Sequence, residues 1–349
     1  MLQRLEENPL LRPGDISPTR QGLEVLCTLN PAAVRFGEEI LLLVRVGEKA
    51  PEEPGSVTYL YYDAEDGEAK IGRYAKDDPD LDCSDPRWYL YQGRKVLSSM
   101  SHLRLARSRD GKNFTFDPAP AIFPATPYEA YGCEDARITK IDNTYYITYT
   151  AVSGRGVTVT LASTRDFVTF ERHGIIFPPF QKDVALFPEK VRGMYVCRHR
   201  PFMSQLNPAC IWTAYSPDLH CWGYHEQTLA PQPGTWQAGR VGAGANPIKT
   251  PDGWLEMYHA ADAQGRYAIG AMLSDLEHPE RILTETREPI FQPEAEYELK
   301  GVYQNCVFHN GLVLDDDGVI HFYYGAADRI CAGALTTLDE MIAAAKNEL

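Results

Sequence analysis

The residues best suited to chemistry lie in the segment GCEDARITKIDNTYYITYTA at positions 132–151. Glu134, Asp135 and Arg137 crowd together there, just before a strongly apolar run that is typical of a hairpin. An isolated acidic pair beside an arginine is usually a surface turn with an ion pair. Because the adjoining run is apolar, we expect this pair at a rim near buried surface, where a carboxylic acid can hold a raised pKa and deliver a proton.

A second group of candidates follows short aromatic or aliphatic runs that recur along the chain. Such runs include ILLLVRV (40–46), MYVCRHRP (194–201), WLEMYHAA (254–261) and IHFYYGAA (320–327). Polar residues stand at or just beyond their ends: Arg45, Arg200, His259 and Asp328. If the runs are the innermost strands of a repeated β architecture, these four side chains converge at one mouth. Their equivalent positions favour a site over scattered surface charges.

The runs belong to a longer repeat that must position these residues. After several of them a strand-like segment ends in Ser or Thr, then Asp, then a turn, with Asp110, Asp166, Asp218 and Asp275 as the clear copies and Asp339 as a weaker one. Short Ser and Asp side chains can hydrogen-bond local backbone and close such turns. A period of about 50 to 65 residues with about four short strands is typical of one propeller blade.

Five such copies fill the chain, so we predict an all-β protein with the fold of a five-bladed β-propeller and a short C-terminal helix. It would be a single catalytic domain over residues 1–349, with an N-terminal segment at 1–29 and the helix at 336–349. Thr337 can cap that helix, with Glu340 three residues on. A pair of β-sandwiches is the alternative fold, which the long period disfavours.

Charge and composition exclude several classes of partner. The formal net charge of −14 disfavours nucleic acid and anionic membranes, but it leaves room for a small anion in a local basic cluster. The N-terminus lacks an apolar run long enough for a signal peptide, and no stretch approaches the roughly 20 apolar residues of a membrane span. The eight cysteines form no CxxC pair, which favours buried thiols over disulfides or a metal site. We expect a soluble, cytoplasmic protein.

The acidic segment resembles the signature of glycoside hydrolase family 130, the mannoside phosphorylase and mannosidase family. The resemblance runs in collinear order from about Asn30 onward, through KDVALFPEKVRGMYVCRHRP (182–201), SPDLHCWG (216–223), GRVGAGANPIKTPDGWLEMYHA (239–260) and YYGAAD (323–328). Two departures are visible: Ala136 stands where the family has Pro, and Ala260 where it has Gly. They put loop shape and specificity in doubt more than reaction class.

The resemblance implies a five-bladed propeller and an inverting attack by inorganic phosphate at the anomeric carbon of a β-mannoside. Asp135 matches the family's general acid, whose proton is thought to pass through a sugar hydroxyl to the glycosidic oxygen. An inverting hydrolase needs a second carboxylate to activate water, whereas phosphate arrives already charged and needs a basic pocket instead. Phosphate would be a co-substrate, with no cofactor and no metal. The products would be α-mannose 1-phosphate and a shortened sugar.

The resemblance also implies a set of binding residues. The phosphate pocket matches Lys182, Arg200, Arg240, His259 and Tyr267. Substrate contacts match Asn30, Arg45, Asp183 and Asp328, with Glu134 and Arg137 of the acidic motif beside them. Taken alone, Lys182 could be a solvated loop charge, His259 a satisfied core histidine and Tyr267 a packing residue.

Two other functions stay open at this point. An inverting β-mannosidase would use water, with Glu134 as one candidate base. A non-catalytic propeller would only bind glycans. The linkage, β-1,2 or β-1,4, and the acceptor sugar stay open, and so does the oligomeric state, with a homo-oligomer among the alternatives.

Overall fold

The computed structural model describes residues 1–202 and 208–348, and within them the chain is nearly all β. Regular helix in this part is confined to α1 (Glu296–Leu299), α2 (Leu338–Ala345) and the short 3₁₀ turns Pro13–Asp15 and Pro127–Glu129. The expectation of an all-β protein with a short C-terminal helix is therefore confirmed. None of the helices in the described residues is long and apolar enough to cross a membrane.

Most strands fall into consecutive antiparallel groups of four, in which neighbours in sequence pair with each other. The first group is β2 (Glu24–Phe36), β3 (Glu39–Lys49), β9 (Ser99–Ser108) and β10 (Thr115–Phe116). The second is β11 (Gly132–Ile141), β12 (Thr144–Ser153), β13 (Gly156–Thr164) and β14 (Glu171–Phe177). The third is β15 (Gln181–Leu186), β16 (Tyr195–Pro201), β17 (Ile211–Ser216) and β18 (Gly223–Leu229).

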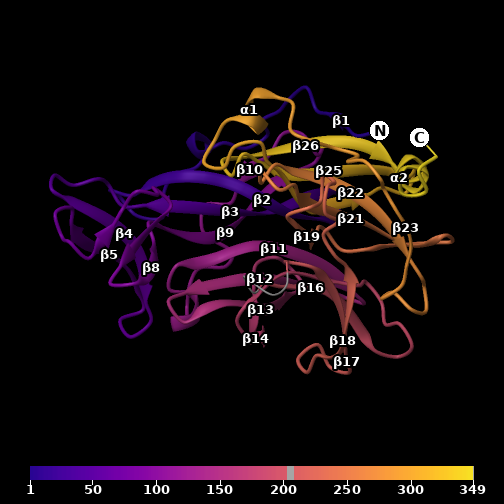
Figure 1. The fold of residues 1–349 in the computed structure, drawn as a ribbon, viewed down its shortest axis with the longest axis horizontal. Coiled ribbons are helices and arrows are strands. Elements are labelled where there is room, and N and C mark those ends of the chain that lie inside the picture. Colours follow the sequence, from indigo (N-terminus) through magenta and orange to yellow (C-terminus); the bar gives the residue numbers. More distant parts are fainter. Residues whose placement is uncertain (203–207, 349) are drawn as a thin grey trace.

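The remaining groups complete the order. The fourth is β19 (Arg240–Ala243), β21 (Gly253–Ala261), β22 (Tyr267–Ser274) and β23 (Ile282–Glu285), with β20 (Ile248–Thr250) beside β21. The fifth is β24 (Val307–Leu314), β25 (Val319–Ala326) and β26 (Ile330–Thr337), completed by β1 (Gln3–Arg4) from the other end of the chain. The groups follow one another around the molecule in sequence order, and the two termini lie close together (Figure 1).

The first strand of each group lies toward the middle of the molecule. β2 lies against β11 and β24, β11 against β15, and β15 against β19. The recurring apolar runs are β3, β12, β16, β21 and β25, which are the second strands of their groups. The expectation that these runs are the innermost strands is therefore wrong. They read as continuous apolar segments because strands flank them on both sides and neighbouring groups cover both faces, as in β21, where every residue is buried.

Apolar side chains fill the space between adjacent groups. Leu41, Leu103, Ile138 and Ile147 join the first group to the second. Leu255, Ile269, Val307, Phe322 and Met341 join the fourth group, the fifth group and α2. The core therefore surrounds the first strands and leaves their starting ends free to carry polar groups.

The predicted Ser/Thr–Asp turns are confirmed at the clear copies of the repeat. Asp110 Oδ1 accepts the backbone N–H groups of Lys112 and Asn113 at 2.9 and 2.8 Å. Equivalent pairs of bonds form at Asp166, Asp218 and Asp275. Asp339 differs, because it lies in the first turn of α2, where Thr337 Oγ1 accepts the N–H of Glu340 at 3.2 Å. The capping prediction is confirmed, and the weak fifth copy is a helix start rather than a strand turn.

The sequence repeat does not predict the large insertion in the first strand group. Between β3 and β9 the chain makes an insertion, residues 50–98, that carries the hairpin β4 (Ser56–Asp63) and β5 (Glu68–Ala75). A small sheet follows, with β6 (Leu81–Asp82), β7 (Trp88–Tyr91) and β8 (Arg94–Leu97). The insertion projects to one side of the molecule (Figure 1).

Candidate active site

A cavity of about 690 Å³ collects most of the predicted site residues. Those that line it come from all the strand groups: Asn30, Arg45, Asp135, Lys182, Asp183, Arg200, Arg240, Tyr267 and Asp328. At this end of the molecule β11, β15 and β19 begin, while β16, β21 and β25 finish. The antiparallel order therefore brings residues far apart in sequence to one opening.

Three of the side chains at the centre are placed by β-bulges in first strands. In β2, β11 and β15 the pairing with the second strand shifts register at Asn30, Asp135 and Asp183. These residues have φ angles of 47°, 49° and 54°, in the left-handed region. Asn and Asp tolerate this conformation better than other side-chain-bearing residues, and bulges re-aim side chains beside active sites. The Asx residues are thus suited to their backbone as well as to their chemistry.

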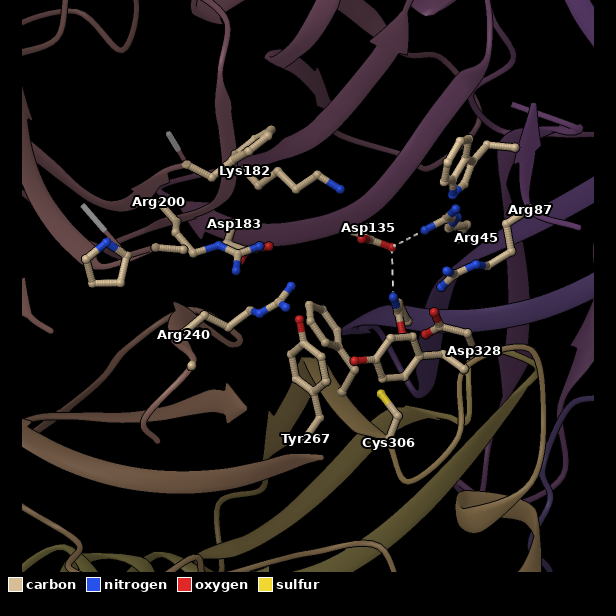
Figure 2. A pocket seen from close by; sticks show the side chains of 18 of the residues that line it. Arg45, Arg87, Asp135, Lys182, Asp183, Arg200, Arg240, Tyr267, Cys306 and Asp328 are labelled. Carbon is tan, nitrogen blue, oxygen red and sulfur yellow. Dashed lines mark hydrogen bonds and ion pairs between the residues drawn. The ribbon is translucent and has the colours of Figure 1, made fainter. Parts of the chain in front are cut away.

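Asp135 is nearly buried, and cationic and amide groups surround it. Its Oδ1 accepts hydrogen bonds from Asn30 Nδ2 at 2.9 Å and Arg45 Nη1 at 3.1 Å, and the bond from Arg45 is visible in Figure 2. Burial acts to raise the pKa of Asp135, but the charges of Arg45 and Lys182 and the bond from Asn30 outweigh it and hold the pKa below its usual value. The expectation of a raised pKa is wrong for Asp135, because cationic side chains lie too close to it.

Asp183 anchors several basic side chains. Its carboxylate pairs with Arg200 Nε at 2.7 Å, Arg137 Nη2 at 3.1 Å and His259 Nε2 at 3.1 Å. Burial opposes ionisation, but Arg200, Arg137 and His259 hold the pKa of Asp183 well below its usual range. Asp183 therefore stays charged, and it fixes Arg200 at the cavity wall.

The basic side chains form a cluster on one side of the cavity. Lys182, Arg200 and Arg240 extend toward the same space as Tyr267 (Figure 2). The Arg240 guanidinium lies 5.6 Å from the centre of the Tyr267 ring. Burial raises the pKa of Tyr267 to about 12 despite the nearby arginines, so its hydroxyl stays a hydrogen-bond donor. All four residues offer donors to a ligand, which suits an oxyanion. We call these four residues the basic clamp.

Glu134, Arg137 and His259 do not belong to the cavity lining among the described residues. Glu134 lies behind the wall, where it pairs with Arg45 Nη2 at 2.8 Å and Lys182 Nζ at 3.9 Å. Arg137 donates to the backbone carbonyls of Asp135, Ala243 and Gly244, as well as to Asp183, and so ties β11 and β15 to β19 and the residue after it.

His259 is fully buried and lies against Phe308, with ring centres 4.0 Å apart. Burial lowers its pKa to about 4 even though Asp183 acts in the opposite direction. The structure thus places this neutral imidazole in the core, with Nε2 bonded to Asp183 and Nδ1 without a hydrogen-bond partner among the described residues. Its direct contact with phosphate stays a prediction.

Asp328 lines the opposite part of the cavity, just after β25, with a φ of 51°. Burial raises its pKa to about 6; Arg45 acts against this shift, and Asp135 and Glu134 add to it. A carboxyl group that changes charge near pH 6 at a cavity wall can accept or donate a hydrogen bond to a sugar hydroxyl.

The sequence analysis missed several lining residues. Arg87, Trp88 and Lys95 come from the insertion, and Tyr303, Cys306 and Phe308 come from the start of the fifth group. The segment WYLYQGRKVL (88–97) carried a usable signal, since aromatic residues alternate around a Gln-Gly turn. The repeat gives no prediction for this segment, because the segment interrupts it.

Comparison with known proteins gives consistent relatives. The pattern of the glycoside hydrolase 130 family, described as beta-1,4-mannooligosaccharide phosphorylase, matches residues 87–347. A beta-1,2-mannobiose phosphorylase of Listeria innocua serovar 6a is 41% identical over 346 residues, covering 98% of this chain and 97% of that protein. A 1,2-beta-oligomannan phosphorylase of Thermoanaerobacter sp. is 40% identical, and the match covers 69% of this chain and 80% of that protein. A solved structure of the Listeria innocua beta-1,2-mannobiose phosphorylase, in complex with beta-1,2-mannobiose, superposes with a TM-score of 0.95 at 40% identity and covers 99% of both chains.

Proposed function

Because the chain belongs to glycoside hydrolase family 130, we propose that it is a glycoside phosphorylase that cleaves a short β-mannoside by inverting attack of inorganic phosphate. The products are α-mannose 1-phosphate and a sugar one residue shorter. The observation that carries this proposal is the basic clamp, which faces Asp135 across one cavity (Figure 2). No cofactor is required, and phosphate is the co-substrate.

In this mechanism Lys182, Arg200, Arg240 and Tyr267 bind the phosphate and cancel its repulsion from the surrounding carboxylates. An oxygen of the phosphate attacks the anomeric carbon from the clamp side, in line with the bond that breaks. Asp135 supplies the proton for the departing oxygen, directly or through a sugar hydroxyl. Asn30 and Arg45 hold the Asp135 carboxyl in place, and Asp183, with His259 behind it, holds Arg200.

The low pKa of Asp135 fits a mechanism in which phosphate binds before the proton is delivered. Arg45 and Lys182 favour its charged form, so the residue is a poor acid before phosphate arrives. A bound phosphate dianion offsets those charges and raises the pKa again. Protonation of the acid is thereby linked to the presence of the nucleophile.

The position of Glu134 supports phosphorolysis over hydrolysis. An inverting hydrolase needs a carboxylate that can reach a water molecule on the face opposite the leaving group. Glu134 lies behind the wall and is occupied by Arg45 and Lys182. Glu134 is therefore poorly suited to activate a water molecule.

The relatives at about 40% identity are named for β-1,2-linked mannosides. We therefore place β-1,2-mannobiose first among the candidate substrates and β-1,4-mannooligosaccharides second. The strand groups, we propose, are the blades of one five-bladed β-propeller that forms a single domain over residues 1–349. Buried thiols at Cys27, Cys133, Cys197, Cys306 and Cys331 support a reducing, cytoplasmic location.

The central test is product formation with and without phosphate. With β-1,2-mannobiose, the protein should release α-mannose 1-phosphate only when phosphate is present. Asp135→Asn should lower kcat by about 10²–10⁴-fold, the usual contribution of a general acid, while the variant keeps a single cooperative melting transition. Free mannose released at equal rates in both conditions would identify a β-mannosidase. If Asp135→Asn binds glycan as the unmodified chain does, and neither protein is active, the protein is a binding module.

A further inference from the structure

The insertion contributes its own wall to the cavity. Arg87, Trp88 and Lys95 line the cavity, and they come from β7, β8 and the residue before β7. Figure 2 places Arg87 beside Arg45 and Asp328, on the side of Asp135 away from Lys182, Arg200 and Arg240. The cavity therefore has two different walls, the basic clamp on one side and the insertion on the other.

Hydrogen bonds hold this insertion wall in a defined position. Ser98, just before β9, donates its backbone N–H to the Arg87 carbonyl at 3.1 Å, which joins the start of β9 directly to the turn that carries Arg87. Asp85 accepts from the Arg87 fork at 2.9 Å (Nε) and 2.6 Å (Nη2). Tyr89 Oη donates to the Thr58 carbonyl at 3.1 Å, which ties β7 to the β4–β5 hairpin. The wall is therefore fixed both to the first strand group and to the rest of the insertion.

The side chains on this wall suit a neutral sugar. The Trp88 ring is partly exposed, and the Lys95 ammonium lies 3.7 Å from its centre. The indole face that Lys95 leaves uncovered offers an apolar surface to the C–H groups of a pyranose, and Lys95 and Arg87 offer donors to its hydroxyls. Asp85 already occupies part of the Arg87 fork, which weakens the attraction of this wall for an anion.

The geometry of in-line attack assigns the insertion wall to the departing sugar of the substrate. In an inverting displacement the nucleophile and the leaving group lie on opposite faces of the anomeric carbon. If phosphate occupies the basic clamp, the departing sugar points toward the insertion. We propose that Trp88, with Arg87 and Lys95, forms the binding subsite for the departing sugar and sets acceptor preference; this inference rests on the proposed phosphorolysis.

The test uses the synthetic direction, in which α-mannose 1-phosphate and mannose are separate substrates. Trp88→Ala should raise the KM for mannose by roughly tenfold, as the loss of one ring contact would, and leave the KM for α-mannose 1-phosphate within about twofold. Tyr91→Ala is the matched control. Tyr91 lies on the same strand but stacks on Tyr74, 4.1 Å away, on the opposite face from Trp88.

A second substrate separates the subsite from the catalytic centre. β-Mannosyl fluoride has a leaving group too small to reach Trp88, so its phosphorolysis should proceed equally well in Trp88→Ala and the unmodified chain. If Trp88→Ala does not fold, Lys95→Met provides the same comparison, with a smaller rise in the KM for mannose. An unmodified chain that transfers no mannosyl group to or from phosphate would refute the proposed function. If the unmodified chain is active but its variants keep the KM for mannose unchanged, the subsite alone is refuted. The same holds if the variants raise the KM for mannose and the KM for α-mannose 1-phosphate equally.

Discussion

At the scale of single residues, the site combines carboxyl groups whose environments push them in opposite directions. Asp135 and Asp183 are held ionised by neighbouring cations, whereas burial keeps the pKa of Asp328 high, at about 6. Groups of one chemical type therefore have different protonation states at one pH. Such separation is common in active sites, where acid and base roles must be kept apart.

The first prediction concerns proton uptake by Asp135. An oxyanion in the basic clamp offsets Lys182 and so raises the pKa of Asp135, which means that anion binding near pH 5 should take up protons. Sulfate is the suitable probe, because it does not titrate in this range. Calorimetry of sulfate binding in buffers of different ionisation enthalpy should give a larger proton uptake for the unmodified chain than for Asp135→Asn. Equal uptake in the two proteins would contradict the linkage.

The second prediction concerns stability and Asp328. The folded chain holds a proton on this group up to about pH 6, while the unfolded chain releases it near pH 4. Stability contributed by the neutral form is therefore present below pH 4 and lost as the pH rises to 6. Asp328→Asn should melt on the order of 2 °C higher than the unmodified chain at pH 8, with no gain at pH 4, and should lose activity.

Asp183→Asn is the matched control for Asp328→Asn. Its carboxylate is ionised in the fold, and its replacement leaves Arg137 and Arg200 without their charge partner. It should therefore lower the melting temperature at pH 8. A gain in both variants would show that charge in the cavity, rather than the environment of Asp328, limits stability.

At the scale of elements, the close approach of first and second strands leaves room only for glycine at certain positions. A Cβ at Gly242 in β19 would lie 2.3 Å from His259 Nε2 and 2.5 Å from Asp183 Oδ2. Gly242→Ala should displace the Asp183 anchor and with it Arg200. We expect the KM for phosphate to rise about tenfold or more. Gly223→Ala, in β18, meets no atom within 4 Å and should leave the KM unchanged.

Some of these elements could be predicted from the sequence, and others could not. The Asp-closed turns were predictable because a side chain and the backbone two or three residues on form them locally. The sequence could not show that the apolar runs are the second strands and not the innermost ones. The first strands are interrupted by bulges and polar residues, so they carry no clear apolar pattern. The bulge in β11 also breaks the alternation of faces, so the order Glu134, Asp135, Arg137 could not indicate that Asp135 alone of the three lines the cavity. The insertion wall required the tertiary structure.

At the scale of the whole molecule, the last strand group is completed by the first residues of the chain. β1 pairs with β26 through Gln3 and Arg4, opposite Leu335 and Ala334. Arg4 then reaches Glu298 with Nε at 2.8 Å and Nη2 at 2.9 Å, and its guanidinium lies 4.3 Å from the centre of the Phe291 ring. Backbone hydrogen bonds thus join the N-terminal strand to the last strand, and a partly buried ion pair joins it to α1.

This closure should stabilise the site as well as the fold. Glu298 is fully buried, and its carbonyl accepts the N–H of Cys306, a residue of the cavity wall. Arg4→Ala leaves that carboxylate without its cation, so we expect a loss of about 2–4 kcal/mol in the free energy of unfolding and a higher KM for the mannoside. Gln3→Ala removes an exposed side chain from the same strand and should change stability by less than about 0.5 kcal/mol. Urea unfolding of both variants measures the difference, and equal midpoints would mean that the ends of the chain close the structure without help from the ion pair.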